Sequence, residues 1–326
     1  MRAGRISVST RAFEVVDVAT PDAGAGQVRI KVGAAGVCLS DVHFLEGILS
    51  PGYLEGDHVT LGHEVAGTID QVGAGVTTST VGDRVVVIAG ERNANQQITT
   101  MGFDYDGGWA EYVVTKAELV AKIPDALAFE QAAIIPDAVS TPWAAITSTG
   151  HVVAGEKVAV FGVGGLGIHA VQLLKIIGAS VIAIDPREDA LANALARGAD
   201  FAFAPDDGEL KKHRGLHAAF DFAGVSPVRK QALSMLGEQG RLVIVGIANE
   251  PIVIPNDMAF TYMRTQIMGH YGSEANHVTE LIELAASGRL DLSHSISEVL
   301  PLESAGEALN KLANKVGNPI RIVLKP

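Results

Sequence analysis

Cysteine is almost absent from this sequence, because its 326 residues include only Cys38. A single cysteine excludes an intramolecular disulfide and a zinc site built from four cysteines. The low cysteine content favours a reducing compartment, and no signal-peptide pattern follows Met1, so we expect a cytoplasmic protein. If Cys38 has a chemical role, it acts as a lone thiolate or as one ligand of a metal.

Long apolar runs and positive charge are also scarce. No run approaches the 18 apolar residues that indicate a transmembrane helix, so we expect no membrane partner. The 25 Lys and Arg residues are outnumbered by 37 Asp and Glu residues, and the net charge of −12 argues against a nucleic-acid partner. The hydrophobic fraction of 48% is typical of a globular protein, and the length suffices for two domains.

The most informative stretch is the run Gly162-Val163-Gly164-Gly165-Leu166-Gly167. An apolar segment precedes it at 156–161, and a segment with helical spacing follows it at 168–178. A second apolar segment, 180–184, ends on Asp185. Together these segments predict a β-turn-α-β unit that carries G-x-G-x-x-G and an acid, which is the pattern of a dinucleotide site.

The glycines and the acid of this unit each have a physical role in a dinucleotide site. Gly162 permits a tight turn, Gly164 lets a pyrophosphate approach the backbone, and Gly167 lets the helix pack closely on the sheet. The helix N-terminus offers N–H groups to the phosphates. Asp185 can accept hydrogen bonds from the ribose hydroxyls and would repel a 2′-phosphate, so NAD is favoured over NADP, although Arg187 nearby could tolerate NADP. The alternative is a purely structural glycine turn.

The two parts of the chain differ in pattern. Residues 1 to about 136 alternate apolar and polar side chains between glycine-rich turns, which predicts a β-rich domain. From about 139 to 268, buried strands alternate with helices, which predicts a doubly wound parallel sheet and hence an α/β protein. Further strands are expected at 27–32, 81–88, 107–114, 218–222, 241–246 and 320–324, helices at 278–286 and 304–313, and a loop at 90–106.

Two stretches of the first part carry metal-ligating residue types. The stretch 36–43 contains Cys38, and the stretch 61–67 contains His63 beside Glu64. A thiolate, an imidazole and a carboxylate are ligands that zinc accepts. Taken alone, a cysteine is more often a small buried apolar residue, and a histidine beside a glutamate is more often a surface pair.

Five motifs occur together in the order and spacing of one known family. Cys38-x-Ser40-Asp41-x-His43, Gly62-His63-Glu64, Gly82-Asp83-Arg84-Val85, Gly108-Trp109-Ala110-Glu111-Tyr112 and the glycine run resemble the zinc-dependent medium-chain alcohol dehydrogenases over the whole chain. The resemblance implies a GroES-like catalytic domain formed by 1–138 and 269–326. It implies a Rossmann domain formed by 139–268.

The resemblance also implies the ligands of one catalytic zinc. Cys38 and His63 match two of the family's ligands, and Asp137 stands where the third ligand is usually a cysteine. A carboxylate oxygen is an adequate replacement, because zinc binds it at a similar distance. Glu64 matches a carboxylate that can approach the zinc from the side away from substrate, and Asp41 matches a residue that orients His63.

Proton transfer and cofactor contacts follow from the same resemblance. Ser40 and His43 match the residues that pass the substrate proton to water, whereas the plainer alternative makes Ser40 an N-cap and His43 a solvated helix residue. Thr141 matches the residue that contacts the nicotinamide, and Arg321 matches an arginine that binds the pyrophosphate. The implied cofactor site comprises Thr141, Gly162, Gly164, Gly165, Leu166, Gly167, Asp185, Arg187 and Arg321.

Three departures from the family pattern lead to expectations. The segment 90–106 lacks the four cysteines of a structural zinc lobe, so we expect one zinc per subunit. Leu39 replaces a basic residue near the pyrophosphate, which should weaken NADH binding. Ala89 replaces a bulky aromatic residue, which leaves room for a branched or secondary substrate.

The sequence therefore predicts an NAD-dependent alcohol dehydrogenase that transfers a hydride between an alcohol and NAD. Secondary alcohols and ketones are preferred, and primary alcohols and aldehydes are close alternatives. Two other functions stay open: a zinc-free quinone or enoyl reductase of the same superfamily, and a non-catalytic NAD-binding protein. Relatives pair the edge strands of their Rossmann domains, so we expect a homodimer or homotetramer.

Overall fold

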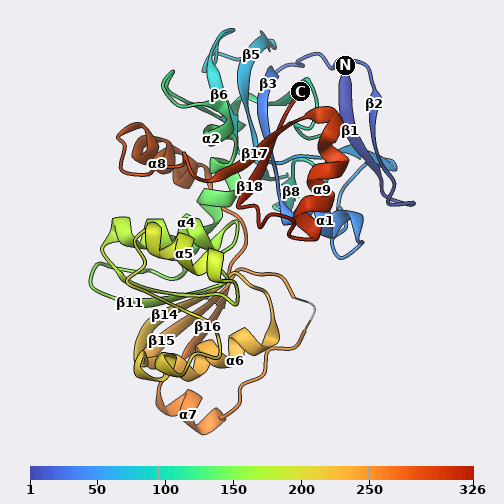
Figure 1. Cartoon of the computed structure of the whole chain (residues 1–326). Helices are drawn as coiled ribbons and strands as arrows, with labels where there is room; N and C mark the ends of the chain where they lie inside the picture. The colour runs from blue at the N-terminus through green and yellow to red at the C-terminus, as the bar shows by residue number, and fades with distance from the viewer. Residues whose placement is uncertain (94, 249) are drawn as a thin grey trace. The chain divides into compact units, whose positions relative to one another are not determined.

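The structure is a computed structural model that describes residues 1–93, 95–248 and 250–326 (Figure 1). The chain forms two compact units, Met1–Ala138 with Glu274–Pro326, and Val139–Ser273. The first boundary lies where the sequence indicated it, and the second lies at 273/274 rather than at 268/269. The hydroxyl oxygens of Ser140 and Ser273 lie 2.7 Å apart within the second unit.

Two sheets form the framework of the first unit, and their strands pair antiparallel except for the parallel pair β17–β18. One has the strand order β2-β1-β4, and the larger has the order β10-β6-β5-β3-β18-β17, with β9 also paired to β3. The bounds are β1 Arg2–Ser7, β2 Phe13–Asp17, β3 Gln27–Val37, β4 His58–Thr60, β5 Val65–Val72, β6 Arg84–Val87, β9 Tyr112–Lys116, β10 Val120–Lys122, β17 Ile296–Pro301 and β18 Arg321–Lys325. The helices are α1 Leu39–Leu45, α2 Phe129–Ala133, α8 Ala275–Ala286 and α9 Ala305–Ala313.

The long strand β3 is the central element of this unit. It pairs with β5, β9 and β18, and along its first half the inward positions Val28, Ile30 and Val32 are buried. This alternation is the period-two pattern that the sequence predicted for 27–32. The strand β18 pairs with β3 on one side and β17 on the other, so the C-terminal strand is an inner strand of the sheet.

The segment 90–106 is not the plain loop that the sequence predicted. Its first part is a hairpin of β7 (Gly90–Arg92) and β8 (Ile98–Thr100). The side-chain oxygen of Asn93 accepts the backbone N–H groups of Asn95 and Gln97, which closes the turn. Asparagine favours such local bonds, so the polar composition that indicated a loop also builds this hairpin. Residue 94 lies outside the described residues.

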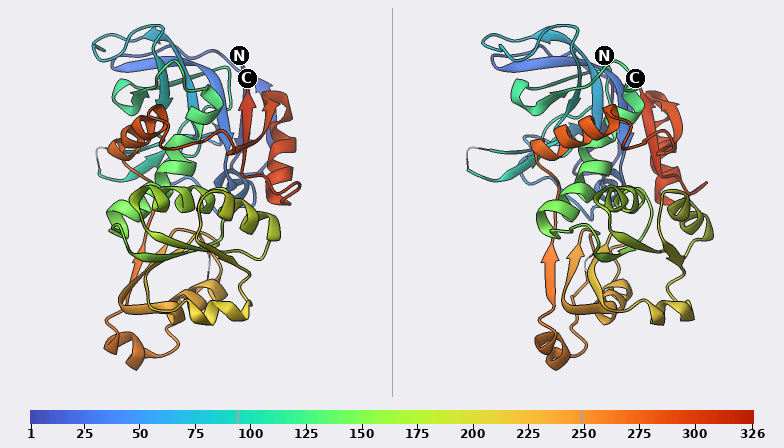
Figure 2. Two further views of the ribbon diagram at one scale, coloured as in Figure 1. Left: turned by 60° about the vertical axis from the view of Figure 1, so that its left-hand side comes forward. Right: turned by 90° about the vertical axis from the view of Figure 1, so that its left-hand side faces the viewer.

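A six-stranded parallel sheet forms the second unit, in the order β13-β12-β11-β14-β15-β16. Within this unit, Figure 2 shows α4 and α5 on one face of the sheet and α6 on the other. The strand bounds are β11 Lys157–Phe161, β12 Ser180–Ile184, β13 Phe201–Phe203, β14 Leu216–Asp221, β15 Leu236–Ile244 and β16 Gln266–Gly269. The helices are α3 Ser140–Ala144, α4 Gly167–Ile177, α5 Glu188–Ala196, α6 Ser226–Met235 and α7 Asp257–Tyr262. This is the doubly wound fold expected from the alternation of strands and helices.

Helix length sets a limit on membrane insertion. Within 1–93, 95–248 and 250–326, no helix is long and apolar enough to cross a bilayer.

Candidate metal centre and dinucleotide site

Three side chains that are far apart in the sequence meet in the first unit. Cys38 follows β3, His63 lies between β4 and β5, and Asp137 lies in the helical turn Ile135–Val139. Their ligand atoms all lie within 4.8 Å of one another. The sulfur of Cys38 is 3.3 Å from Oδ2 of Asp137, and Nε2 of His63 is 3.5 Å from the same oxygen. We call these three residues the metal centre.

The donor set and its spacing fit zinc. A tetrahedral zinc with bonds of about 2.0–2.3 Å separates its ligand atoms by roughly 3.3–3.7 Å. The two distances to Asp137 Oδ2, 3.3 and 3.5 Å, fall in that range. One sulfur, one imidazole nitrogen and one carboxylate oxygen leave a fourth position for water or substrate, which is the pattern of a catalytic zinc site.

Asp41 lies beside both neighbouring ligands. Its Oδ2 accepts the backbone N–H of Cys38 at 2.9 Å, and its Oδ1 lies 3.5 Å from Nδ1 of His63. With Nδ1 facing Asp41, Nε2 is the nitrogen that points toward Asp137. Burial alone would lower the pKa of His63, but Asp41 and Asp137 raise it well above its usual value. These carboxylates favour a cation at the metal centre.

Trp109 and two glycines hold the backbone that carries His63. Gly62 has φ of +96°, and a Cβ there would lie 2.2 Å from Cδ1 of Trp109. The indole Nε1 donates to the carbonyl of Gly36 at 2.9 Å, and the whole Trp109 side chain is buried. The Gly-His-Glu and Gly-Trp motifs are therefore two sides of one packing contact. The predicted strand 107–114 begins only at Tyr112, because the backbone of Gly107 and Gly108 bonds to the segment before His63.

Glu64 and Arg321 form a buried ion pair behind the metal centre. Nη2 of Arg321 lies 3.0 Å from Oε1 of Glu64 and 3.6 Å from Oδ2 of Asp137. Oε1 also accepts the N–H of Ala138 at 3.0 Å, and Arg321 Nη1 donates to the carbonyl of Val37 at 3.2 Å. Burial raises the pKa of Glu64 to about 8, although Arg321 opposes this. The pyrophosphate role expected of Arg321 stays a prediction.

Ser40 and His43 lie on α1, three residues apart and half-buried. The N-cap of this helix is Cys38, so the interpretation of Ser40 as an N-cap is wrong. The Ser40 hydroxyl lies 3.5 Å from the sulfur of Cys38. Because residues three apart share a helix face, both side chains can serve one path from the metal centre.

Phe103 belongs to this site although the sequence analysis did not single it out. Its ring stacks on Phe44 with centroids 5.0 Å apart and lies 5.6 Å from the ring of His63. The backbone around Phe103 is fixed, because Asp104 accepts the N–H groups of Thr100, Gly52 and Tyr53. No local pattern marks such a residue, since its role depends on a loop that returns to a distant histidine.

We expect Phe103→Ala to weaken zinc binding about tenfold, because residues that contact the metal ligands hold these ligands in orientation. Chelator competition on the purified protein measures this affinity, and thermal unfolding measures the accompanying loss of packing. Phe103→Tyr keeps the ring and should bind zinc like the wild type. A Phe103→Ala protein that is less stable but binds zinc normally would show that Phe103 only packs.

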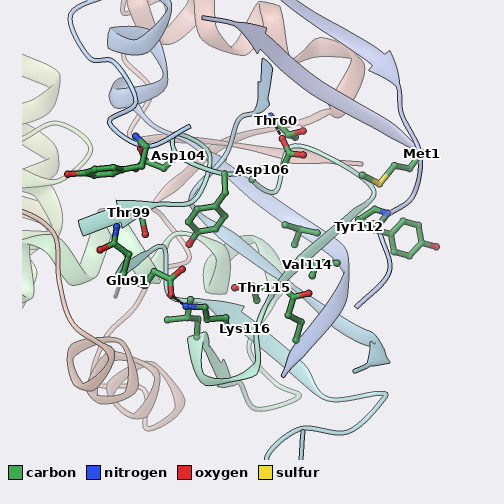
Figure 3. Close-up of a pocket in the computed structure, with 18 residues that line it drawn as sticks. Met1, Thr60, Glu91, Thr99, Asp104, Asp106, Tyr112, Val114, Thr115 and Lys116 are labelled. Carbon is green, nitrogen blue, oxygen red and sulfur yellow. Dashed lines mark hydrogen bonds and ion pairs between the residues drawn. The ribbon is translucent and has the colours of Figure 1, made fainter. Parts of the chain in front are cut away.

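A separate hollow of about 570 Å³ lies in the first unit (Figure 3). Its described lining includes Tyr105, Glu91 and Lys116 and none of the three metal-centre residues. The ammonium of Lys116 lies 2.5 Å from Oε2 of Glu91, and Figure 3 shows these two side chains next to each other. The hollow is therefore distinct from the metal centre.

The second unit holds the glycine turn, Gly162–Gly167, between β11 and α4. Gly162 has φ of +82°, and a Cβ on Gly167 would lie 1.9 Å from the carbonyl oxygen of Gly162. His169 Nδ1 lies 2.7 Å from the carbonyl oxygen of Gly165. The turn itself therefore requires glycine at positions 162 and 167. A Cβ on Gly164 would contact only Nη2 of Arg187, 3.7 Å away. Leu166 is the N-cap of α4.

Asp185 and Thr141 complete the predicted cofactor residues of the second unit. Asp185 follows β12, is 3% exposed, and accepts the N–H of Val163 at 3.0 Å. It is also paired with Arg187, whose Nε lies 3.0 Å from Oδ1. Thr141 is buried in α3.

Two family models match the chain. The Alcohol dehydrogenase GroES-like domain matches residues 24–125, and the Zinc-binding dehydrogenase domain matches residues 165–287. An alcohol dehydrogenase of Geobacillus stearothermophilus is 32% identical over 346 residues, which cover 100% of this chain and 99% of the relative. An NAD-dependent alcohol dehydrogenase of Sulfurisphaera tokodaii is 28% identical, with 96% and 97% covered.

A solved structure of a dehydrogenase has a similar fold. The crystal structure of 2R,3R-butanediol dehydrogenase from Bacillus subtilis superposes with a TM-score of 0.90 at 26% identity. The superposition covers 100% of this chain and 99% of that chain.

Proposed function

Because the chain belongs to the zinc-dependent medium-chain alcohol dehydrogenase family, we propose that it oxidises alcohols with NAD at the metal centre. The hydride passes between an alcohol carbon and NAD, and the product is a ketone or an aldehyde. The observation that carries this proposal is the convergence of Cys38, His63 and Asp137 with zinc-like spacing.

Each residue of the metal centre and its surroundings has a role in the proposed reaction. Cys38, His63 and Asp137 would hold Zn²⁺, which would supply Lewis acidity to the substrate oxygen, and bound NAD would supply the hydride acceptor. Asp41 orients the imidazole of His63. The Ser40 hydroxyl accepts the hydroxyl proton of the substrate as it gives up its own proton, which the His43 imidazole takes onward to water. Phe103 keeps the His63 ring in place by packing on it.

Zinc stoichiometry follows from composition. Cys38 is the single cysteine, so a second site of four thiolates cannot form, and we propose one zinc per chain. Secondary alcohols are the proposed preference because Ala89 is small. The name of the butanediol dehydrogenase, an enzyme for a secondary alcohol, agrees with this preference.

Metal analysis and an alcohol panel test this function together. We expect close to one zinc per chain and an absorbance increase at 340 nm with NAD, larger for secondary than for primary alcohols of equal length. Zinc-free protein that still reduces quinones or enoyl compounds would contradict the proposal. NAD binding without turnover of any alcohol or ketone would leave a non-catalytic protein.

We also propose a dimer built on β16. This strand is the last of its sheet, and its outer edge is unpaired in the described parts of the chain. Tyr262 is 84% exposed and Met258 is 77% exposed on the preceding helix α7. An open strand edge and exposed apolar side chains both favour pairing with a second copy. Light scattering should give twice the chain mass of 34.0 kDa or a multiple, and a single 34.0 kDa species would contradict this.

A further inference from the structure

A buried ion pair of the second unit lies at the carboxyl end of β14. Asp221 is the last residue of this strand and is fully buried, and Arg229 of α6 is 5% exposed. Nε of Arg229 lies 3.0 Å from Oδ2 of Asp221. Burial of two charges is costly, and the cost is offset only when the pair makes further hydrogen bonds.

The further bonds of this pair go to the backbone of two turns. Oδ1 of Asp221 accepts the N–H groups of Ala223 at 3.0 Å and Gly224 at 2.9 Å, in the turn after β14. Nη2 of Arg229 donates to the carbonyl oxygen of Gly246 at 3.2 Å, in the turn after β15. The pair therefore fixes both turns to α6.

These two turns lie against each other and against the glycine turn. A Cβ on Gly246 would lie 2.4 Å from the backbone nitrogen of Gly224. A Cβ on Gly162 would lie 2.9 Å from the backbone nitrogen of Ala223. Backbone segments packed this closely cannot shift independently of one another.

The position of these turns in the sheet indicates what they bind. In the order β13-β12-β11-β14-β15-β16, the strands from β11 to β13 extend in one direction and those from β14 to β16 in the other. The order therefore reverses between β11 and β14, and doubly wound sheets bind dinucleotides outside the carboxyl ends of the strands at such a point. Gly162 follows β11 and Ala223 follows β14, so their turns flank this point.

We propose that Asp221 and Arg229 are positioning residues, which hold the turns after β14 and β15 in the conformation that binds the dinucleotide. Both side chains are buried and act through the backbone that they bind, not by contact with the coenzyme. A turn that is ordered before the ligand arrives costs less free energy on binding, which raises the affinity. The inference rests on the proposed function, because it requires a dinucleotide at the glycine turn.

Fluorescence titration with NADH compares Arg229→Met with the wild type. We expect the variant to bind NADH about tenfold more weakly, because the turn after β15 loses a bond and Asp221 keeps an unpaired buried charge. Its zinc content should match the wild type, since the metal centre lies in the other unit. Arg229→Lys keeps the charge but cannot bind Asp221 and Gly246 through two separate nitrogens, so we expect NADH binding about threefold weaker than wild type.

A second ion pair of the same unit provides the matched control. Nη2 of Arg241 lies 2.6 Å from Oε2 of Glu156, and these side chains are 17% and 13% exposed. Glu156 precedes β11, at the opposite end of that strand from Gly162. Arg241→Met should therefore lower the melting temperature, as Arg229→Met does, but keep the dissociation constant of NADH within about twofold of the wild type.

The outcomes separate this inference from the proposed function. If Arg229→Met is less stable but binds NADH like the wild type, or if Arg241→Met weakens NADH binding equally, the positioning role is overturned. Should Arg229→Met not fold, Arg229→Lys decides: wild-type affinity overturns the role, and weaker binding supports it. Wild-type protein that binds no NADH overturns the proposed function and the inference with it.

Discussion

Asp137→Ala is expected to lose its zinc and, with it, its alcohol dehydrogenase activity. Asp137 Oδ2 lies within 3.5 Å of both other donor atoms. Without this oxygen, the metal centre keeps only the ligand atoms of Cys38 and His63. Loss of a residue that only contacts a metal ligand already lowers metal affinity about 10–100-fold. Loss of a ligand itself should therefore lower metal affinity more than about 100-fold. Metal analysis after dialysis against a chelator measures the zinc, and NAD reduction measures the activity.

Two further variants make this result specific. Asp137→Cys restores the ligand type that the family usually has here, and should retain zinc. Asp125→Ala removes an exposed carboxylate of the same unit and should change neither zinc nor rate. If Asp137→Ala keeps both zinc and activity, Asp137 is a packing residue and the proposed ligand set is wrong.

Arg321→Met is expected to destabilise the protein by roughly 3–5 kcal/mol, the cost of breaking a buried ion pair. Arg321 is 2% exposed and its partner Glu64 is fully buried, so water cannot replace the lost contact. The double variant Glu64→Gln with Arg321→Met should recover part of this loss, because neither charge is then left unpaired. Denaturant unfolding of the metal-free proteins, followed by circular dichroism, measures the difference.

The chain offers an exposed pair of the same kind as a control. Arg264 pairs with Glu238, and both side chains are more than half exposed. Exposed pairs contribute about 0–1 kcal/mol, so Arg264→Met should change the unfolding free energy by less than about 1 kcal/mol. Equal effects of the two substitutions would mean that the buried pair does not stabilise the first unit.

Local patterns in the sequence predicted much of the framework. The alternation in β3 and the glycine turn with its flanking strands are confirmed, because each depends on side chains that are near one another in the chain. The family assignment is confirmed by the relatives, and it was available because five motifs occur in one order. The structure brings Cys38, His63 and Asp137 together, and their role as ligands is a proposal.

Contacts between distant segments that no motif marks were beyond prediction from sequence. The asparagine-rich segment 90–106 indicated a loop, but Asn93 closes a hairpin there. The approach of Phe103 to His63 depends on how that segment returns to the strand before His63. Only the pairing of β18 with both neighbours places Arg321 behind the metal centre.

X-ray absorption at the zinc edge tests the ligand set most directly. With Cys38, His63 and Asp137 as ligands, the spectrum should show one sulfur at about 2.3 Å and nitrogen or oxygen neighbours at about 2.0–2.2 Å. The Asp137→Cys protein should show two sulfurs. A wild-type spectrum without sulfur, or an unchanged sulfur count in Asp137→Cys, would contradict the proposed metal centre.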